Sequence, residues 1–336
     1  MSNEIEHTTL IASFLMTKGG VGKTTISCNV SHILSLAGYR VLHVDGDTQG
    51  SSTDLLEAYQ NGRVLSKMDL LKMDTAAFFV EDLNDNARRY ICQTRYPNID
   101  LIPNTPPLEA ITAEDPEPLS MDNIFFMSKD PNKYFHFRKN LEEIAGDYDF
   151  VIIDGSGHSD ALLTSTIIAS DVIFSPITND CFTDPVITKL LSRIKGTQAK
   201  YLSGYYKEES NLLEDRQFQG FFLNSFIKES ESFAIMKKRL LRQKFEEKYN
   251  ARFIEQSIRH SESVGKRNSM QVMWLEEDMR NSWAKTAAPT VDLMKLIIQY
   301  MRFMDQEHED RLEKYIRTVK TEKTFPYEEV FHYVGE

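Results

Sequence analysis

The sequence MTKGGVGKTT at residues 16–25 is the strongest indicator of the fold. It follows an apolar run at residues 10–16 and opens a segment in which apolar residues from Ile26 to Ala37 recur on one face of a helix. Gly38 then stands where a left-handed residue would end that helix. A strand, a glycine-rich turn and a helix N-terminus in this order form a phosphate site, because backbone N–H groups and the helix dipole favour anions there.

Two residues of this stretch have predicted roles. Lys23 is placed to reach the β- and γ-phosphates of a nucleotide, and the Thr24 hydroxyl to ligate Mg²⁺. The usual phosphate-loop spacing requires a glycine at position 17, where this chain has Thr17 followed by a second lysine, Lys18. The stretch is therefore the deviant form KGGxGKT. The alternative, a glycine-rich turn that only joins a strand to a helix, is disfavoured by seven matching positions in the right context.

The chain resembles a known family here. The sequence KGGVGKTT, followed by VLHVDGDTQG at residues 41–50, is similar to the ParA/MinD class of deviant Walker ATPases, and most similar to ParA-type plasmid and chromosome partition ATPases. The resemblance implies a sandwich homodimer that closes on ATP, with Lys18 crossing the interface to the nucleotide of the other subunit. The residues expected to cradle that nucleotide are Gly19, Gly20, Val21, Gly22, Lys23, Thr24 and Thr25.

Composition limits the classes of protein that remain. The chain has 336 residues and a formal net charge of −11, which argues against uniform coating of nucleic acid but allows a local basic patch. Cys28, Cys92 and Cys181 show no metal or disulfide spacing. Glu4 and Glu6 stand where a signal peptide would be basic, and no apolar run reaches the length of about 20 residues that spans a bilayer. We expect a cytoplasmic protein, and by the resemblance a nucleoid-associated one.

Two carboxylates end a predicted strand at residues 40–45. Asp45 and Asp47 would lie beside the phosphate loop in a parallel sheet, where carboxylates hold the Mg²⁺ shell or orient the attacking water. By resemblance, Asp47 is the residue tied to hydrolysis and Asp45 the one near the metal, although Thr48 replaces the family's proline. Considered alone, the pair would be interpreted as a solvated strand-end loop.

A second strand, at residues 149–154, also ends in a carboxylate. Asp154 follows an unbroken apolar run and is predicted to bind the Mg²⁺ water shell. Gly157 could present a backbone N–H to the γ-phosphate, although the prolines common in the family are missing around it. The alternative is a core strand that ends in an aspartate by chance.

The order of these segments predicts an α/β fold with a doubly wound, mostly parallel sheet flanked by helices, as in P-loop NTPases of the deviant Walker A class. Further strands are expected at residues 98–104, 171–177 and 219–224. We predict one ATPase domain over residues 1–305, with an acidic surface insertion at about 105–133 that contains a short helix at Met121–Met127. A C-terminal helical extension is predicted over residues 306–336.

The base of the nucleotide has three predicted contacts. Asn224 ends a predicted strand, where an amide can pair with adenine and where the family uses an asparagine. A helix-capping asparagine is an equal alternative. By resemblance, Ser261 and Glu262 lie in the segment over the base.

A basic segment between residues 237 and 252 reverses the overall acidity. Its cations are predicted to lie away from Phe233, Met236 and Leu240, on a face suited to sequence-independent phosphate contacts. Further along the chain, the resemblance implies a second DNA-contacting surface at Arg259, Lys266 and Arg267. The predicted DNA-contacting residues are therefore Lys238, Arg239, Arg242, Arg259, Lys266 and Arg267. A solvated amphipathic helix is the alternative.

The leading hypothesis is a slow, Mg²⁺-dependent ATPase for DNA segregation. Its ATP-bound dimer would bind DNA non-specifically, and a ParB-like centromere-binding protein would stimulate hydrolysis and release. The main alternative is a MinD-like membrane-surface positioning ATPase anchored by a C-terminal amphipathic helix. Leu312, Tyr315, Ile316 and Val319 share a small apolar face there, which we expect to dock on the body of the protein or a partner. A metal-cluster carrier is disfavoured because this chain has no C-x-x-C motif. A regulator that binds nucleotide without hydrolysing it remains an open alternative.

Overall fold

The computed structural model describes residues 9–47, 49–73, 75–104, 121–157, 160–178, 184–202, 218–223, 231–259, 283–301, 310 and 312–317. Within these ranges the strands are β1 (Leu10–Phe14), β2 (Val41–Gly46), β3 (Tyr59–Gln60), β4 (Arg63–Val64), β5 (Cys92–Gln93), β6 (Ile99–Ile102), β7 (Phe150–Gly155), β8 (Val172–Ile177) and β9 (Phe218–Leu223). The helices are α1 (Lys23–Leu36), α2 (Ser51–Leu56), α3 (Lys67–Lys72), α4 (Ala76–Val80), α5 (Met121–Met127), α6 (His136–Ala145), α7 (Asp160–Ala169), α8 (Asp184–Thr197), α11 (Glu231–Tyr249) and α13 (Trp283–Tyr300), with a 3₁₀ turn at Ala87–Tyr90 and a π turn at Gln198–Leu202.

The described strands form one sheet in the order β4-β3-β5-β6-β2-β7-β1-β8-β9. The strands from β6 to β9 in this order run parallel, whereas β5, β3 and β4 pair antiparallel at one edge. Since β1 lies between β7 and β8, the connection from β1 through α1 to β2 passes over β7. This arrangement confirms the predicted doubly wound, mostly parallel α/β sheet.

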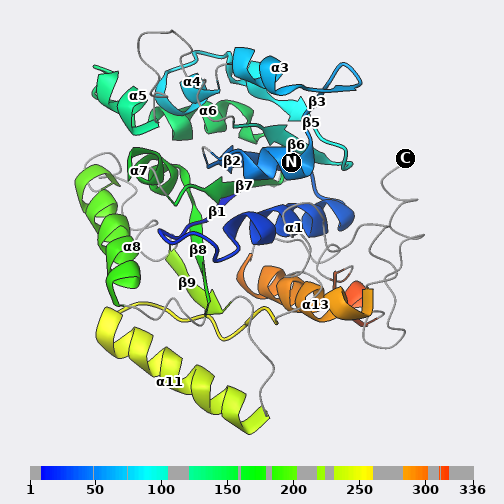
Figure 1. Ribbon diagram of the computed structural model, residues 1–336, viewed down its shortest axis with the longest axis vertical. Helices are drawn as coiled ribbons and strands as arrows, with labels where there is room; N and C mark the ends of the chain where they lie inside the picture. Colours follow the sequence, from blue (N-terminus) through cyan, green and yellow to red (C-terminus); the bar gives the residue numbers. More distant parts are fainter. Residues whose placement is uncertain are drawn as a thin grey trace, which may run out of the picture.

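Helices cover both faces of the sheet (Figure 1). Alternate residues of β7 point to opposite faces, as a strand's period of two requires, and all are buried. Phe150 and Ile152 join a core cluster with α1 and α13, while Val151 and Ile153 join another with α4, α5, α6 and α7. The strand is therefore apolar throughout, as expected for a central parallel strand.

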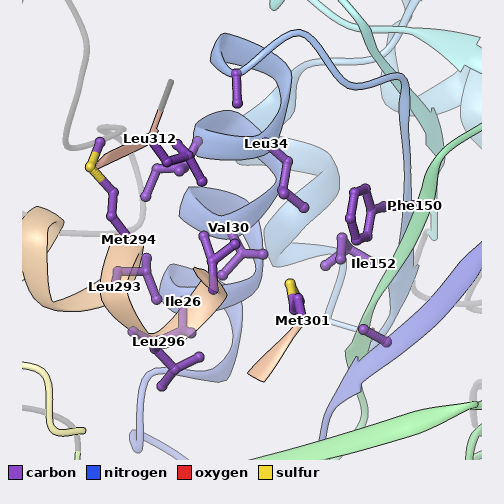
Figure 2. Packing of buried hydrophobic residues seen from close by; sticks show 14 of the residues in the cluster. Ile26, Val30, Leu34, Phe150, Ile152, Leu293, Met294, Leu296, Met301 and Leu312 are labelled. Carbon is purple, nitrogen blue, oxygen red and sulfur yellow. The ribbon is translucent and has the colours of Figure 1, made fainter. Parts of the chain in front are cut away.

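The helix α1 packs its predicted apolar face between the sheet and α13. Figure 2 shows Ile26 and Val30 on the side of α1 that faces α13, and Leu34 on the side that faces Phe150 of β7. The helix ends as predicted, because Gly38 has a φ of 102°, in the left-handed region that favours glycine. This packing fixes the start of α1, and with it the phosphate loop, against the sheet edge.

The predicted short helix at Met121–Met127 is confirmed as α5, whereas residues 105–120 of the proposed insertion lie outside the described residues. Near the C-terminus, Leu312, Tyr315 and Ile316 are buried in the same cluster as α1 and α13. The prediction that this apolar face docks on the body of the protein is confirmed for these three residues. Val319 lies outside the described part of the chain. No helix within the described ranges is long and apolar enough to cross a bilayer.

Candidate functional site

The phosphate loop joins the buried end of β1 to the first turn of α1. Gly20 and Gly22 have φ angles of 73° and 88°, so the backbone uses the left-handed region at both positions. Gly22 stands at the N-cap of α1 and, as a glycine, supplies no side chain to cap the first-turn N–H groups. The first-turn N–H groups of α1 therefore point toward the loop without a cap from Gly22, the arrangement that binds phosphate.

The ammonium group of Lys23 lies beside the segment that follows β7. Lys23 is only 8% exposed. A Cβ atom placed on Gly157 would lie 3.1 Å from Lys23 Nζ and 3.1 Å from the carbonyl oxygen of Met16. Any side chain at position 157 would thus crowd the lysine. The structure brings Lys23 and Gly157 together, as the sequence predicts for two sides of one phosphate site.

Asp154 lies at the carboxyl end of β7 and is fully buried. Burial raises its pKa to about 6, while the Thr24 hydroxyl and the Lys23 ammonium act in the opposite direction. Its Oδ2 accepts a hydrogen bond from Ser52 Oγ at 3.0 Å, and its Oδ1 has no hydrogen-bond partner among the described residues. A buried carboxylate oxygen without a partner is costly, and a cation or its water shell would satisfy it.

Asp45 lies opposite Asp154 in the register of β2 and β7 but makes different contacts. Its Oδ2 accepts hydrogen bonds from the Thr53 N–H at 2.8 Å and the Thr53 hydroxyl at 2.6 Å, and its Oδ1 accepts one from the Asp47 N–H at 3.2 Å. Burial, and then the charge of Asp154, raise its pKa to about 8. Asp45 therefore holds the start of α2, and this geometry gives no support to the predicted metal role.

Asp47 follows β2 and lies close in sequence to Asp45, the partner of Asp154 across the sheet. It is 9% exposed, and its Oδ1 accepts a hydrogen bond from the Gln49 N–H at 3.1 Å. Its negative charge raises the pKa of Asp154. Asp47 thus acts electrostatically on Asp154, and its predicted role in hydrolysis stays a prediction.

The donor set suits Mg²⁺ shared with a nucleotide. In the part of the chain that the structure describes, no three His, Cys, Asp or Glu side chains are placed to hold a metal by themselves. Mg²⁺ is commonly bound by one or two protein oxygens together with substrate phosphates and water. The Thr24 hydroxyl and the unpartnered Oδ1 of Asp154 fit that requirement.

Lys18 and its neighbours form the outer rim of the loop. Lys18 is half-buried, and Gly19 and Gly20 are exposed. The predicted contact of Lys18 with a second subunit stays a prediction. The residues Asn224, Ser261, Glu262, Lys266 and Arg267 all lie outside the described residues.

The predicted faces of the basic helix need a correction. Leu240, expected on the buried side of α11, is 57% exposed, whereas Leu241 and Phe245 are buried in the cluster with β9 and α8. The buried face of α11 therefore contains Leu241 and Phe245 instead of Leu240. The ring of Phe245 packs on Phe221 and Phe253, at centroid distances of 4.9 and 5.4 Å. Arg239 is exposed next to Leu240.

Two predicted DNA-contacting arginines have carboxylate partners. Arg242 pairs with Glu246 at 2.8 Å and with Glu255 at 2.7 Å. Arg259 binds both oxygens of Asp292, at 2.7 and 2.9 Å. Their positive charge is thus largely compensated. Arg239 makes no ion pair with any described residue, and the side chain of Lys238 is not among those described.

Comparison with known proteins agrees with this geometry. The AAA domain family matches residues 9–204, more than half of the chain. The sporulation initiation inhibitor protein Soj of Bacillus subtilis is 28% identical over 183 residues, 54% of this chain and 63% of Soj. The chromosome partitioning protein ParA of Caulobacter vibrioides is 27% identical over 180 residues, 53% of this chain and 59% of ParA. The chain thus aligns with about three fifths of the length of these relatives.

Solved structures share the fold at low identity. McdA of Cyanothece in its apo form has a TM-score of 0.59 and 15% identity, with 86% of this chain and 100% of that chain covered. A putative plasmid partition protein of Borrelia burgdorferi bound to AMPPNP has a TM-score of 0.54 and 19% identity, covering 87% and 99%. Cobyrinic acid a,c-diamide synthase of Mycobacterium smegmatis with ADP and magnesium has a TM-score of 0.52 and 20% identity, covering 70% and 82%.

The family match covers the phosphate loop, the Asp45–Asp47 strand end and Asp154, the same segments that the structure gathers at one sheet edge. The chain therefore belongs to the AAA domain family, and it is similar to the partition proteins Soj and ParA over about half of its length.

Proposed function

We propose that the protein is a Mg²⁺-dependent ATPase of the DNA-partition type. The observation that carries this proposal is the buried Lys23 ammonium beside Gly157, with Asp154 and its unpartnered oxygen at the same sheet edge. Lys23 and the N–H groups of the loop would bind the phosphates, and Thr24 and Asp154 would hold Mg²⁺. When bound, the ion neutralises charge that develops on the phosphates during hydrolysis. Asp47 would orient the attacking water.

The proposal includes an ATP-closed homodimer that depends on Lys18. Lys18 is half-buried in the same loop as Lys23, beside the exposed Gly19 and Gly20, and the resemblance of KGGVGKTT to the deviant Walker class supports a role for Lys18 at the nucleotide of a facing subunit. We expect Lys18→Ala to retain ATP binding by the monomer but to lose the ATP-dependent dimer. Light scattering with size exclusion, in ATP and in ADP, measures this change. A Lys18→Ala protein that still dimerises with ATP would remove Lys18 from the interface.

The proposal also includes non-specific DNA binding by the dimer, with release when a ParB-like partner stimulates hydrolysis. The basic helix α11 supports this step. Arg242 of this helix is paired with carboxylates, so among the described residues of α11 the exposed Arg239 is the better candidate for a phosphate contact. Lys238, Lys266 and Arg267 extend the candidate surface along the sequence. Phosphate contacts of this kind are independent of DNA sequence and weaken with salt.

Replacing Arg239 and Arg242 together by alanine should reduce ATP-dependent DNA affinity. The slope of log K against log salt should become shallower by about 0.9 for each phosphate that the variant no longer neutralises. A titration of labelled duplex DNA with ATP, with ADP and without nucleotide, at several salt concentrations, measures both quantities. Arg63→Ala, which removes an exposed, ion-paired arginine on β4, is the matched control. Unchanged ATP-dependent binding by the double variant would place the DNA surface elsewhere.

The membrane-positioning alternative has less support. Its anchor would be the apolar face of the C-terminal helix, but Leu312, Tyr315 and Ile316 of that face are buried against α1 and α13. Co-sedimentation with liposomes in ATP, beside the DNA titration, separates the two functions.

A further inference from the structure

The first turn of α2 contacts both buried carboxylates of the site. Ser52 donates from Oγ to Asp154 Oδ2 at 3.0 Å, and the next residue, Thr53, donates two hydrogen bonds to Asp45. Ser52 and Asp154 are both fully buried. A hydroxyl and a carboxylate without access to water depend on each other for hydrogen bonding, so this contact fixes the orientation of both groups.

The sheet brings α2 to this position. Gly46 of β2 pairs with Gly155 of β7, one residue beyond the facing pair Asp45 and Asp154. A Cβ atom on Gly46 would lie 2.7 Å from the main-chain oxygen of Asp154, so the glycine permits this close approach. The chain then turns and enters α2 at Ser51, within reach of the end of β7.

The contact with Ser52 satisfies only one of the two carboxylate oxygens of Asp154. Oδ2 is occupied by Ser52, while Oδ1 is buried with no partner among the described groups. The carboxylate lies near the Thr24 hydroxyl and the Lys23 ammonium, the groups assigned to Mg²⁺ and phosphate. Partners that hold a metal-binding carboxylate through its second oxygen tune the affinity of the site without touching the ion.

We propose that Ser52 is a positioning residue for the Mg²⁺ site. It holds Asp154 through Oδ2, so that Oδ1 is kept available for the shell of the ion that accompanies the triphosphate. Ser52 touches neither nucleotide nor ion, and it acts only through Asp154. Because α2 directly follows the loop that carries Asp47, the same contact ties that loop to β7. This inference rests on the proposed binding of Mg²⁺ and ATP.

Titration of Mg²⁺ against the full-length protein and a fluorescent ATP analogue tests the role. Removing a group that orients a metal-binding residue commonly weakens metal affinity by about 10- to 100-fold. We expect Ser52→Ala to raise the Mg²⁺ concentration for half-maximal binding by at least about tenfold. Binding of the analogue in EDTA should stay unchanged. Ser51→Ala, in the same helix turn but with a half-buried side chain, is the matched control and should behave as the wild type.

Two results would overturn the inference. One is a Ser52→Ala protein with the Mg²⁺ dependence of the wild type. The other is an equal loss of binding with and without Mg²⁺, which would mean that Ser52 supports the phosphate loop rather than Asp154. If Ser52→Ala does not fold, Ser52→Cys replaces the hydroxyl by a weaker donor of similar size and should shift the Mg²⁺ dependence in the same direction. Failure of the wild type itself to bind the analogue with Mg²⁺ would instead refute the proposed function.

Discussion

Lys23→Ala should abolish ATP binding at nucleotide concentrations that saturate the wild-type protein. The Lys23 side chain is 8% exposed, and its ammonium lies beside Gly157, where a bound γ-phosphate would meet it. Removing one member of a buried, hydrogen-bonded charge pair costs about 2–5 kcal/mol. At room temperature that corresponds to a loss of about thirty-fold to a few thousand-fold in affinity. Equilibrium binding of a fluorescent ATP analogue measures the effect.

The control for this change is Lys72→Ala, which truncates an exposed lysine at the end of α3. Thermal unfolding of both variants without nucleotide shows whether the fold is retained, since Lys23→Ala also removes a cation near the buried Asp154. ATP binding by a folded Lys23→Ala protein within about threefold of the wild type would contradict the assignment of this loop as the phosphate site.

Much of the central sheet follows from local sequence. The runs at residues 40–45 and 149–154 are rich in apolar residues and end in aspartate, and they form β2 and β7 as predicted. Strong hydrophobic runs bounded by glycine specify such strands regardless of distant contacts. Residues 51–96, by contrast, cannot be assigned to elements from the sequence, because β3, β4 and β5 have two residues each and are too short to show a period.

The contacts between elements are harder to predict. Leu240 and Leu241 are both leucines on one helix, and only the position of Phe221 and Phe253 decides which one is buried. The hydrogen bond of Ser52 to Asp154 joins residues 102 positions apart and depends on the pairing of β2 with β7. The sequence offers one signal, the three hydroxyl residues Ser51, Ser52 and Thr53 at the start of a helix, which is more often explained by capping.

Asp47→Ala should retain ATP binding but lose most of the hydrolysis. The Asp47 side chain accepts a hydrogen bond from the Gln49 N–H. This contact involves neither Lys23 nor Thr24, the residues assigned to phosphate and Mg²⁺ binding. A positioned carboxylate that orients or deprotonates a nucleophile contributes about 10²- to 10⁴-fold to the rate. We therefore expect kcat to fall by at least about a hundredfold. Phosphate release measured with excess ATP gives the rate, and the fluorescent analogue gives the affinity.

The alanine change also removes the acceptor for the Gln49 N–H, so a lower rate could arise from a disordered loop. Asp47→Asn separates the two effects, because its amide oxygen still accepts that hydrogen bond while the charge is lost. If the carboxylate acts on water, Asp47→Asn should be as slow as Asp47→Ala, and Asp54→Asn, an exposed carboxylate on α2, should hydrolyse at the wild-type rate. If Asp47→Asn hydrolyses ATP normally, the carboxylate has only a structural role, and another group must orient the water.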